Sequence, residues 1–205
     1  LDGSIDISIS GGVLPYTYFW IDSISGLTYP PTTEDLINIG SGNYWCTVTD
    51  ANGCSALPFQ VIITEPDAIS TSPILTNITC SGGADGGIAL NAIGGNPPLS
   101  ISWLGPNGFS STFDPLFSLE AGTYTDSIID NNGCVFTDVI TLTEPATLNN
   151  ALSAINMSCN GVCNGTINTQ SNGGTIPYSY LWNNSSTNSN LDSLCVGNYT
   201  IQISD

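Results

Sequence analysis

The sequence contains no lysine, arginine or histidine among its 205 residues. Asp and Glu, 17 residues in all, are the only charged side chains, and the formal net charge at pH 7 is −17. No ion pair between side chains can form within this chain, so its stability must come from apolar burial, backbone hydrogen bonds and covalent cross-links. Phosphate groups need cationic partners, which argues against nucleic-acid binding. An anionic membrane would repel the chain, and we expect membrane contact only through regions outside this segment.

The same absences narrow the chemistry that the chain can catalyse. General acid–base catalysis would fall to carboxylates alone, and a cysteine nucleophile would lack its usual basic partner. A glycosidase needs two carboxylates on either side of one bond. The adjacent pair Glu34 and Asp35 is not repeated, and nothing around it resembles a site. We therefore expect that this chain is not an enzyme.

Long apolar runs and helical periodicity are also missing. No apolar stretch approaches the length of a membrane span, and residues 33–36 would form at most one helical turn. The chain is nonetheless 40% hydrophobic and 9% aromatic, which is enough to build packed cores. Its apolar residues occur in short β-branched and aromatic runs between Gly, Pro, Asn and Asp, a pattern that indicates an all-β protein.

One set of short motifs recurs three times with a period of about 80 residues. A Gly-Gly pair precedes a proline and an alternating segment that ends in Trp, and a Gly-x-Tyr follows. Asn-Gly-Cys and Thr-Glu-Pro then close the first two copies. The recurring aromatic residues are Trp20, Trp103 and Trp182, and Tyr44, Tyr124 and Tyr199. Such self-similarity predicts a linear array of small domains, at residues 1–66, 67–145 and 146–205. The first and third copies lack parts of the pattern, so we expect a segment of a longer protein.

Alternation of apolar and polar residues predicts the strands of each copy. One strand leads to the Gly-Gly pair, a second ends in the Trp, a third begins at the Tyr, and a fourth closes the first two copies. The expected ranges are 4–10, 16–21, 44–49 and 59–64; 88–93, 99–104, 124–129 and 139–143; and 166–170, 178–182 and 199–204. The pattern L-x-x-G-x-Y before Tyr124 and Tyr199 has the spacing of a tyrosine corner. We therefore predict tandem immunoglobulin-like antiparallel β-sandwich domains, with another small antiparallel barrel as the alternative.

The first copy carries the clearest residues through which the chain resembles a known family. In order, these are Asp2-Gly3-Ser4-Ile5, the Gly11-Gly12 pair, the segment from Pro15 to Trp20, Gly42-Asn43-Tyr44 and the turn from Asp50 to Cys54. They resemble the SprB repeat, and the resemblance spans the whole segment. It implies an exported, surface-displayed filament of gliding Bacteroidetes, carried out by type IX secretion and serving cell adhesion or gliding motility. The same repeats also occur in other large surface proteins.

Seven cysteines in small Gly-rich repeats favour disulfides and an oxidising location. Zinc is the rival interpretation, but the chain has no histidine and no two matching cysteine pairs. Cys80 recurs as Cys159, and Cys54 recurs as Cys134. We therefore predict a Cys80–Cys134 disulfide across the second copy, with Cys54 and Cys159 bonded to cysteines outside this segment.

The third copy carries two further cysteines, Cys163 and Cys195, which we predict to form a second disulfide because they occur together. Cys46 lies on the inward face of the first copy and is expected to be a buried free thiol. Asp126 takes the same inward position in the second copy. A buried unpaired carboxylate is costly, so we expect a bulged strand, a wet sheet edge or a bound cation at this position.

A chain with this charge is a natural partner for hard divalent cations. Calcium is the candidate cofactor, and Glu65, Asp67, Asp85 and Asp130 are its candidate ligands at the junction of two copies. No Asp-x-Asp-x-Asp ladder exists. The alternative is that these residues form turns and end strands.

Three Asp-Ser-apolar sequences resemble the O-glycosylation signal of Bacteroidetes. Their acceptor hydroxyls are those of Ser23, Ser127 and Ser193. If they are modified, these hydroxyls must be exposed, and the protein is a glycoprotein. The alternative is a chance match, because the chain is rich in serine and the pattern is short.

The leading functional hypothesis is a structural repeat segment of a large extracellular, cell-surface adhesin filament. The segment would act as a disulfide-tied stalk whose partners are neighbouring repeats of the same chain. The alternative is a glycan- or surface-binding β-sandwich module, because Phe19 and Trp45 take outward positions in the first copy alone. These aromatic residues would contact surface glycans or other filament chains, unless they only pack against the longer loop at residues 26–31.

Overall fold

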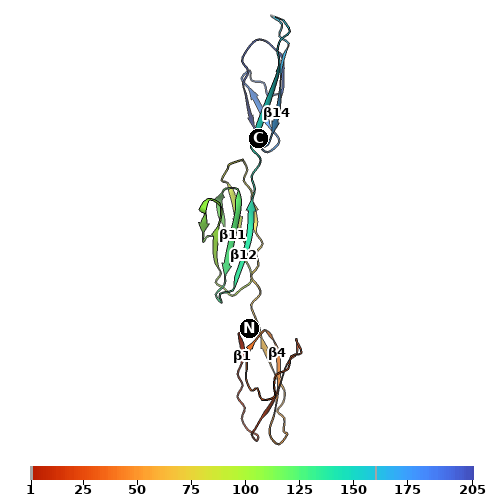
Figure 1. Ribbon diagram of the computed structural model, residues 1–205, viewed down its shortest axis with the longest axis vertical. Coiled ribbons are helices and arrows are strands. Elements are labelled where there is room, and N and C mark those ends of the chain that lie inside the picture. The colour runs from red at the N-terminus through yellow and green to blue at the C-terminus, as the bar shows by residue number, and fades with distance from the viewer. Residues whose placement is uncertain (1, 160) are drawn as a thin grey trace. The chain divides into compact units, whose positions relative to one another are not determined.

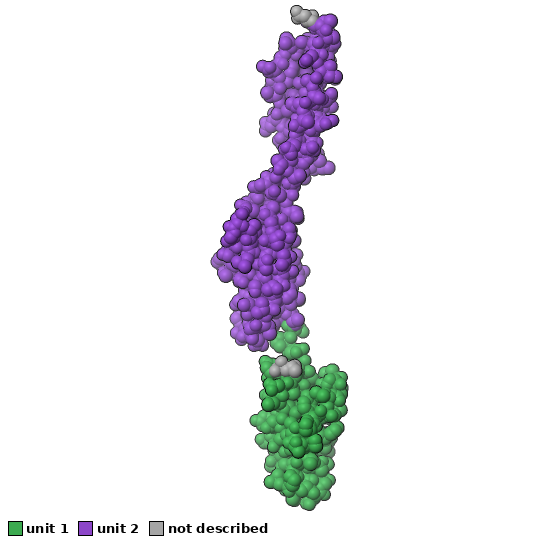
Figure 2. Space-filling model, in the orientation of Figure 1, with its two compact units in different colours: residues 1–67 green, residues 68–205 purple. Residues whose placement is uncertain are grey.

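A computed structural model describes residues 2–159 and 161–205 of the chain. Apart from one 3₁₀ turn, Pro106–Gly108, the regular elements of these residues are β-strands that pair antiparallel. Figure 2 colours two compact units, Leu1–Asp67 and Ala68–Asp205. Buried apolar side chains form three separate clusters, one in each copy of the repeated motifs. The predicted all-β, immunoglobulin-like sandwich class is confirmed. Within the described residues, no helix has the length and apolar character needed to cross a membrane.

The first copy is a sandwich of two antiparallel sheets (Figure 1). One sheet pairs β1 (Gly3–Ile5) with β3 (Leu36–Ile39), and the other has the order β2 (Thr17–Asp22), β4 (Gly42–Thr49), β5 (Phe59–Ile63). Trp20 on β2 is fully buried between the sheets. Its indole Nε1 donates a hydrogen bond to the Glu34 carbonyl oxygen at 3.0 Å, which satisfies the polar end of this large apolar side chain.

The second copy has the most complete set of strands. One sheet has the order β10 (Leu116–Leu119), β7 (Gly86–Ala89), β6 (Ile74–Thr76). The other has the order β12 (Val135–Leu142), β11 (Gly122–Ile129), β8 (Ser100–Leu104), β9 (Ser110–Ser111), and Figure 1 shows β11 and β12 side by side. Trp103, Tyr124 and Leu142 are each about 1% exposed, and they belong to the largest of the three buried clusters.

The third copy has a smaller second sheet. The first sheet has the order β13 (Asn149–Ile155), β14 (Gly165–Asn172), β16 (Leu191–Leu194), and the second pairs β15 (Ser179–Trp182) with β17 (Ile201–Ser204). Among the residues that the structure describes, no strand lies beside β17 in the place that β12 takes beside β11. In the described part of this copy, the buried cluster contains Trp182, Leu191 and Leu194.

A tyrosine corner lies at the start of β4 and β11 and just before β17. The hydroxyls of Tyr44, Tyr124 and Tyr199 each donate to the carbonyl oxygen four residues earlier, at 2.9, 2.9 and 3.1 Å. The prediction made from the L-x-x-G-x-Y pattern is therefore confirmed, and it extends to the first copy, where the pattern is imperfect.

The strand before each tyrosine corner was not predicted, and residues 33–36 were expected to form at most a helical turn. The chain instead forms β3, β10 and β16, each with two adjacent exposed residues between buried ends. Asn38, Ser118 and Ser193 lie in these strands with φ of 57°, 56° and 53°. A left-handed residue inside a strand is a bulge, which breaks the two-residue alternation. Periodicity alone therefore could not reveal these strands.

Candidate functional sites

Carboxylates in this chain accept hydrogen bonds from backbone amides, since no cationic side chain is available. Asp130 is the clearest case. Its Oδ1 accepts from the amides of Asn132 and Cys134 at 2.9 and 2.8 Å, which closes the turn between β11 and β12. Its Oδ2 accepts from the amide of Asn96 at 2.9 Å. One carboxylate therefore joins the turn to the loop that follows the Gly-Gly pair.

The other two copies use the same carboxylate. Asp50 makes three equivalent bonds of 2.8 to 3.1 Å in the first copy, and Asp205 accepts from the Thr175 amide at 2.7 Å in the third. The bond from the Asn96 amide holds the pKa of Asp130 below its usual value, and the bond from the Cys54 amide does the same for Asp50. Both groups therefore stabilise the fold as carboxylates.

Two of the four candidate calcium ligands, Asp85 and Asp130, accept hydrogen bonds from the protein itself. Asp85 accepts from the Thr79 hydroxyl at 2.6 Å and the Thr79 amide at 3.1 Å, and the hydroxyl is the main cause of its lowered pKa. Asp85 lies just before β7, at the end of the second sandwich where β12 finishes, whereas the Asp130 turn lies where β12 begins. Glu65 and Asp67 are exposed. Among the described residues, no group of three or more Cys, Asp or Glu side chains could hold a metal ion.

The third copy contains the disulfide expected between Cys163 and Cys195, which are 32 residues apart in sequence. Cys46 is a free thiol with no exposed surface, as expected. Burial raises the pKa of Cys46 to about 11, so this thiol is neutral at physiological pH.

The predicted Cys80–Cys134 disulfide is wrong, because both residues are exposed free thiols. Cys80 follows Ile78, whose amide donates to the Thr143 carbonyl oxygen at the end of β12. Cys134 directly precedes β12. The eight residues of this strand separate the two thiols by roughly 26 Å, whereas bridged cysteines have Cα atoms within about 7 Å. Recurrence in the sequence identified matching positions without showing that they lie at opposite ends of the sandwich.

Phe19 and Trp45 lie on the outer face of the β2-β4-β5 sheet and are 56% and 38% exposed. Phe19 pairs with Thr47, and Trp45 pairs with Ile21 on the neighbouring strand. The two aromatic side chains are therefore diagonal neighbours on one face, within reach of each other. They form the candidate ligand-binding surface of the first copy.

Asp126 is the least expected group in the second core. It is 0% exposed, and neither carboxylate oxygen has a hydrogen-bond partner. Its strand pairs in continuous register on both sides, opposite Trp103 of β8 and Asp138 of β12, so it lies neither in a bulge nor at an edge. Burial, and then the charges of Asp138 and Asp114, raise its pKa.

The three candidate glycosylation serines differ in exposure. Ser23 and Ser193 are exposed, and Ser23 Oγ lies 3.3 Å from the Asn43 carbonyl oxygen. Ser127 is half-buried in the middle of β11, between β8 and β12. Two of these hydroxyls are therefore accessible from solvent, and the third is partly covered by neighbouring strands.

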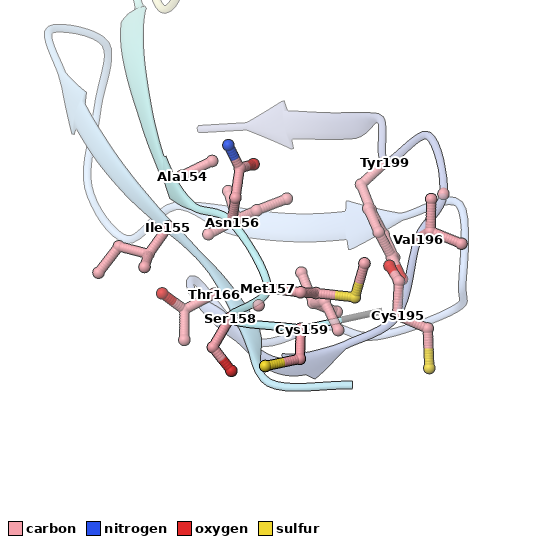
Figure 3. Close-up of a pocket in the computed structure, with 14 residues that line it drawn as sticks. Ala154, Ile155, Asn156, Met157, Ser158, Cys159, Thr166, Cys195, Val196 and Tyr199 are labelled. Carbon is pink, nitrogen blue, oxygen red and sulfur yellow. The ribbon is translucent and has the colours of Figure 1, made fainter. Parts of the chain in front are cut away.

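A groove that sequence analysis missed lies in the third copy and has a volume of about 490 Å³. It runs from the end of β13 and the segment that follows, across the start of β14, to the segment between β16 and β17. Figure 3 shows Met157 and Tyr199 pointing toward each other across this groove, with Cys195 and Val196 beside them. A comparison of the third copy with the second, strand by strand, is the signal that would have predicted it.

These observations define a class of protein: an all-β chain of immunoglobulin-like sandwich fold in which carboxylates close turns. The family model of the SprB repeat matches residues 1–23, 72–108 and 152–187, one segment in each copy. These three segments therefore match the SprB repeat, and the resemblance inferred from the sequence is confirmed.

Other comparisons are remote. A search of curated proteins finds no match. Among solved structures, the amphioxus IgVJ-C2 molecule is 16% identical with a TM-score of 0.33, over 69% of this chain and 96% of that one. A structure titled "Structural basis for Dscam isoform specificity" is 13% identical with a TM-score of 0.32, over 92% of this chain and 58% of that one. At such scores, neither structure carries an argument about function.

Proposed function

We propose that this chain is a structural repeat segment of a large extracellular, cell-surface adhesin filament. Its domains, at residues 1–66, 67–145 and 146–205, form a linear stalk in surface adhesion or gliding motility, with neighbouring repeats as partners. The SprB-repeat match supports the surface-adhesin class. A separate hydrophobic cluster in each copy supports the division into domains. This role requires that each domain resist extension.

The path of the chain through the second copy supports a role in resisting extension. Near its start, Ile69 lies against the Gly95 loop beside the Asp130 turn. The chain leaves this copy at Thr143, at the far end of β12. The eight residues of β12 span roughly 26 Å. A pull on both ends therefore acts along the strands, so that several hydrogen bonds must break together.

The observation that carries the proposal is a direct link between the first and last segments of this domain. The amide of Ile78 donates to the Thr143 carbonyl oxygen at 3.1 Å, and the amide of Thr143 donates to Asn77 Oδ1 at 3.0 Å. These two bonds lie between the parts of the chain that a pull would separate. They therefore form a clamp that must break before the sandwich opens.

Single-molecule force measurements on the 205-residue chain test this role. We expect a distinct unfolding event for the second copy, with a contour-length gain of about 25 nm for its roughly 80 residues. Asn77→Ala removes one clamp bond and should lower the unfolding force of this event, whereas Asn131→Ala, on the exposed turn, should leave it unchanged. Extension without a resolved event, or equal forces in the two variants, would contradict the proposal.

The disulfide of the third copy provides an internal control for the contour lengths measured in this experiment. The Cys163–Cys195 disulfide withholds 32 residues from extension. Reduction should therefore lengthen the third-copy event by about 11 nm and leave the second-copy event unchanged, because Cys80 and Cys134 are free.

A glycan- or surface-binding module is the second candidate function, and the exposed pair Phe19 and Trp45 supports it. Flat aromatic side chains on an uncharged sheet face suit neutral sugar rings, and the corresponding outward residues of the second copy are Ser102 and Thr125. A glycan array with the whole chain tests this candidate. Binding that Trp45→Ala abolishes and Ile62→Ala retains would support it, and binding equal in both variants would contradict it.

A further inference from the structure

We propose that the second copy binds a neutral, N-acetylated oligosaccharide in a groove beside its buried Trp103. The groove lies between β8, β9 and the segment that leads into β10, and its volume is about 810 Å³. Sites for small molecules usually have volumes of roughly 300–1,000 Å³. All the lining residues belong to positions 102–117. The site is therefore separate from the Phe19 and Trp45 pair of the first copy, and it stands whether or not that pair binds a ligand.

The indole of Trp103 lacks the hydrogen bond that the other two core tryptophans make. In the first copy, Trp20 Nε1 donates to the Glu34 carbonyl oxygen at 3.0 Å. In the third copy, Trp182 Nε1 donates to the Asn188 carbonyl oxygen at 2.9 Å. Trp103 Nε1 is equally buried, but it has no partner among the residues that the structure describes. A buried donor without an acceptor is costly, so a ligand that brings an amide carbonyl oxygen to this N–H would supply the missing bond.

One extra residue distinguishes the segment that leads into β10. Asp35, Asp114 and Asn190 hold equivalent places in the three copies, because a side-chain oxygen of each accepts from a backbone amide. Asp35 and Asn190 directly precede β3 and β16, whereas Pro115 separates Asp114 from β10. The residues on either side of Asp114 line the groove. Trp103 is 1% exposed and also belongs to the lining, so it lies at the base of the groove.

The lining combines aromatic rings with hydroxyl groups. Phe113 and Phe117 are 78% and 73% exposed. The third copy has Ser189 and Asp192 at the equivalent positions, so the fold itself does not require aromatic residues there. The hydroxyl groups of the lining are those of Ser102, Ser110, Ser111 and Thr112. The structure describes every lining residue, and none of them is charged. Such a surface suits a neutral sugar, whose rings present apolar faces to aromatic side chains and hydroxyls to polar ones.

The strands beside the groove favour a sugar over an extended peptide. A peptide that adds to a sheet needs a regular strand edge with several unpaired backbone groups. β9 has only two residues, and Ser118 interrupts β10 with a φ of 56°. A bulge of this kind disrupts strand pairing. We therefore assign an acetamido carbonyl of the sugar to Trp103 Nε1 and its ring faces to Phe113 and Phe117.

A titration of the 205-residue chain with chitotetraose, the tetramer of N-acetylglucosamine, tests the proposal through the indole N–H signals of its four tryptophans. We expect a saturable shift of the Trp103 signal and no shift of the Trp20 and Trp182 signals, because these two groups already donate to backbone carbonyls. A shift of the Trp45 signal alone would overturn this site and place the sugar on the first copy instead. No shift of the Trp103 signal at about 10 mM sugar, a concentration that detects even millimolar affinity, would also overturn the proposal.

Cellotetraose is the matched ligand, because it has the same ring arrangement with hydroxyls in place of the acetamido groups. It should bind at least about tenfold more weakly than chitotetraose, a factor that corresponds to about 1.4 kcal/mol. Equal binding of the two sugars would contradict the assignment of the acetamido carbonyl. A capped tetrapeptide of alanine supplies amide carbonyls without sugar rings. If it shifts the Trp103 signal as strongly as chitotetraose does, the occupant is a peptide and the proposal is wrong.

Variants of the exposed phenylalanines test the remainder of the site without disturbing the core. Phe113→Ser and Phe117→Ser should each weaken chitotetraose binding about fivefold, because each removes an aromatic contact. Both variants should keep the unfolding midpoint of the parent, since the side chains are mostly exposed. Val139→Ser is the matched control, because Val139 is 61% exposed on β12 and lies outside the groove. It should bind as the parent does, and equal affinity in all three variants would overturn the proposal.

Discussion

Replacement of the buried carboxylate of Asp126 by a thiol should stabilise the second copy and remove one component of its pH dependence. The first copy of this chain already has a cysteine at the equivalent position. Cys46 takes the same position opposite Trp20 that Asp126 takes opposite Trp103, and it is equally buried. The pKa of Cys46 is raised to about 11, so an equivalent thiol would remain neutral across the accessible pH range.

The expected gain in stability follows from the cost of burying a polar group that has no hydrogen-bond partner. A buried polar group without a hydrogen bond costs about 1–3 kcal/mol, so the variant should gain about 2 kcal/mol where Asp126 is still protonated. The pKa of Asp126 is raised from 3.8 in the folded state, and the folded state therefore binds more protons than the unfolded state above that pH. Its stability falls as pH rises, by up to about 1.4 kcal/mol per pH unit, until the raised pKa is passed. The advantage of Asp126→Cys grows over the same range.

Urea unfolding between pH 4 and 8, with hydrogen exchange to assign the second copy, measures both effects. Asp126→Asn is the matched control because it keeps a polar group of the same shape without a titratable proton. It should lose the downward slope and retain most of the lower stability. If Asp126→Cys is less stable than the parent at pH 7, or if the slope persists in both variants, the carboxylate is hydrated or paired in solution and our reasoning is refuted.

Three further outcomes are expected. Ser118→Gly should stabilise the second copy by about 1 kcal/mol in urea unfolding, because Ser118 has a positive φ that glycine adopts without strain; destabilisation would mean that its side chain contributes a contact. Asp130 has a lowered pKa, so its contribution to stability is present above pH 3.8 and is lost as pH falls through the folded pKa. Asp130→Asn should therefore weaken the loss of stability that we expect in the parent as pH falls below about 4, and an unchanged acid dependence would contradict this. Reduction of Cys163–Cys195 should destabilise the third copy by about 3.7 kcal/mol by the chain-entropy relation, and hydrogen exchange should detect no change in the first two copies.

The sequence predicted the parts of the fold that repeat regularly. Alternation located the strands that contain Trp20, Trp103 and Trp182. The Tyr spacing predicted corners that the hydroxyl bonds confirm. The strands before these corners were missed because a left-handed residue interrupts each one. Local pattern carries information about regular strands, whereas a bulge changes which side chains face inward.

The sites were less predictable because they depend on which end of a strand a residue occupies. Cys80 and Cys134 recur faithfully, yet β12 separates them, while Cys163 and Cys195 meet because they border the same end of the third copy. Asp126 was recognised as unusual from its position, but only the continuous pairing of β11 excluded a bulge or an edge.

The turn carboxylate has a consequence for how such copies can diverge. Within the described residues, the hydrogen bonds that Asp50, Asp130 and Asp205 accept come from main-chain amides. No second side chain therefore has to change in step with them. Substitutions elsewhere on the surface leave these carboxylate–amide hydrogen bonds intact, whether they change the size or the polarity of a side chain. Duplicated copies can therefore drift apart in sequence, one residue at a time, without passing through an unfolded intermediate.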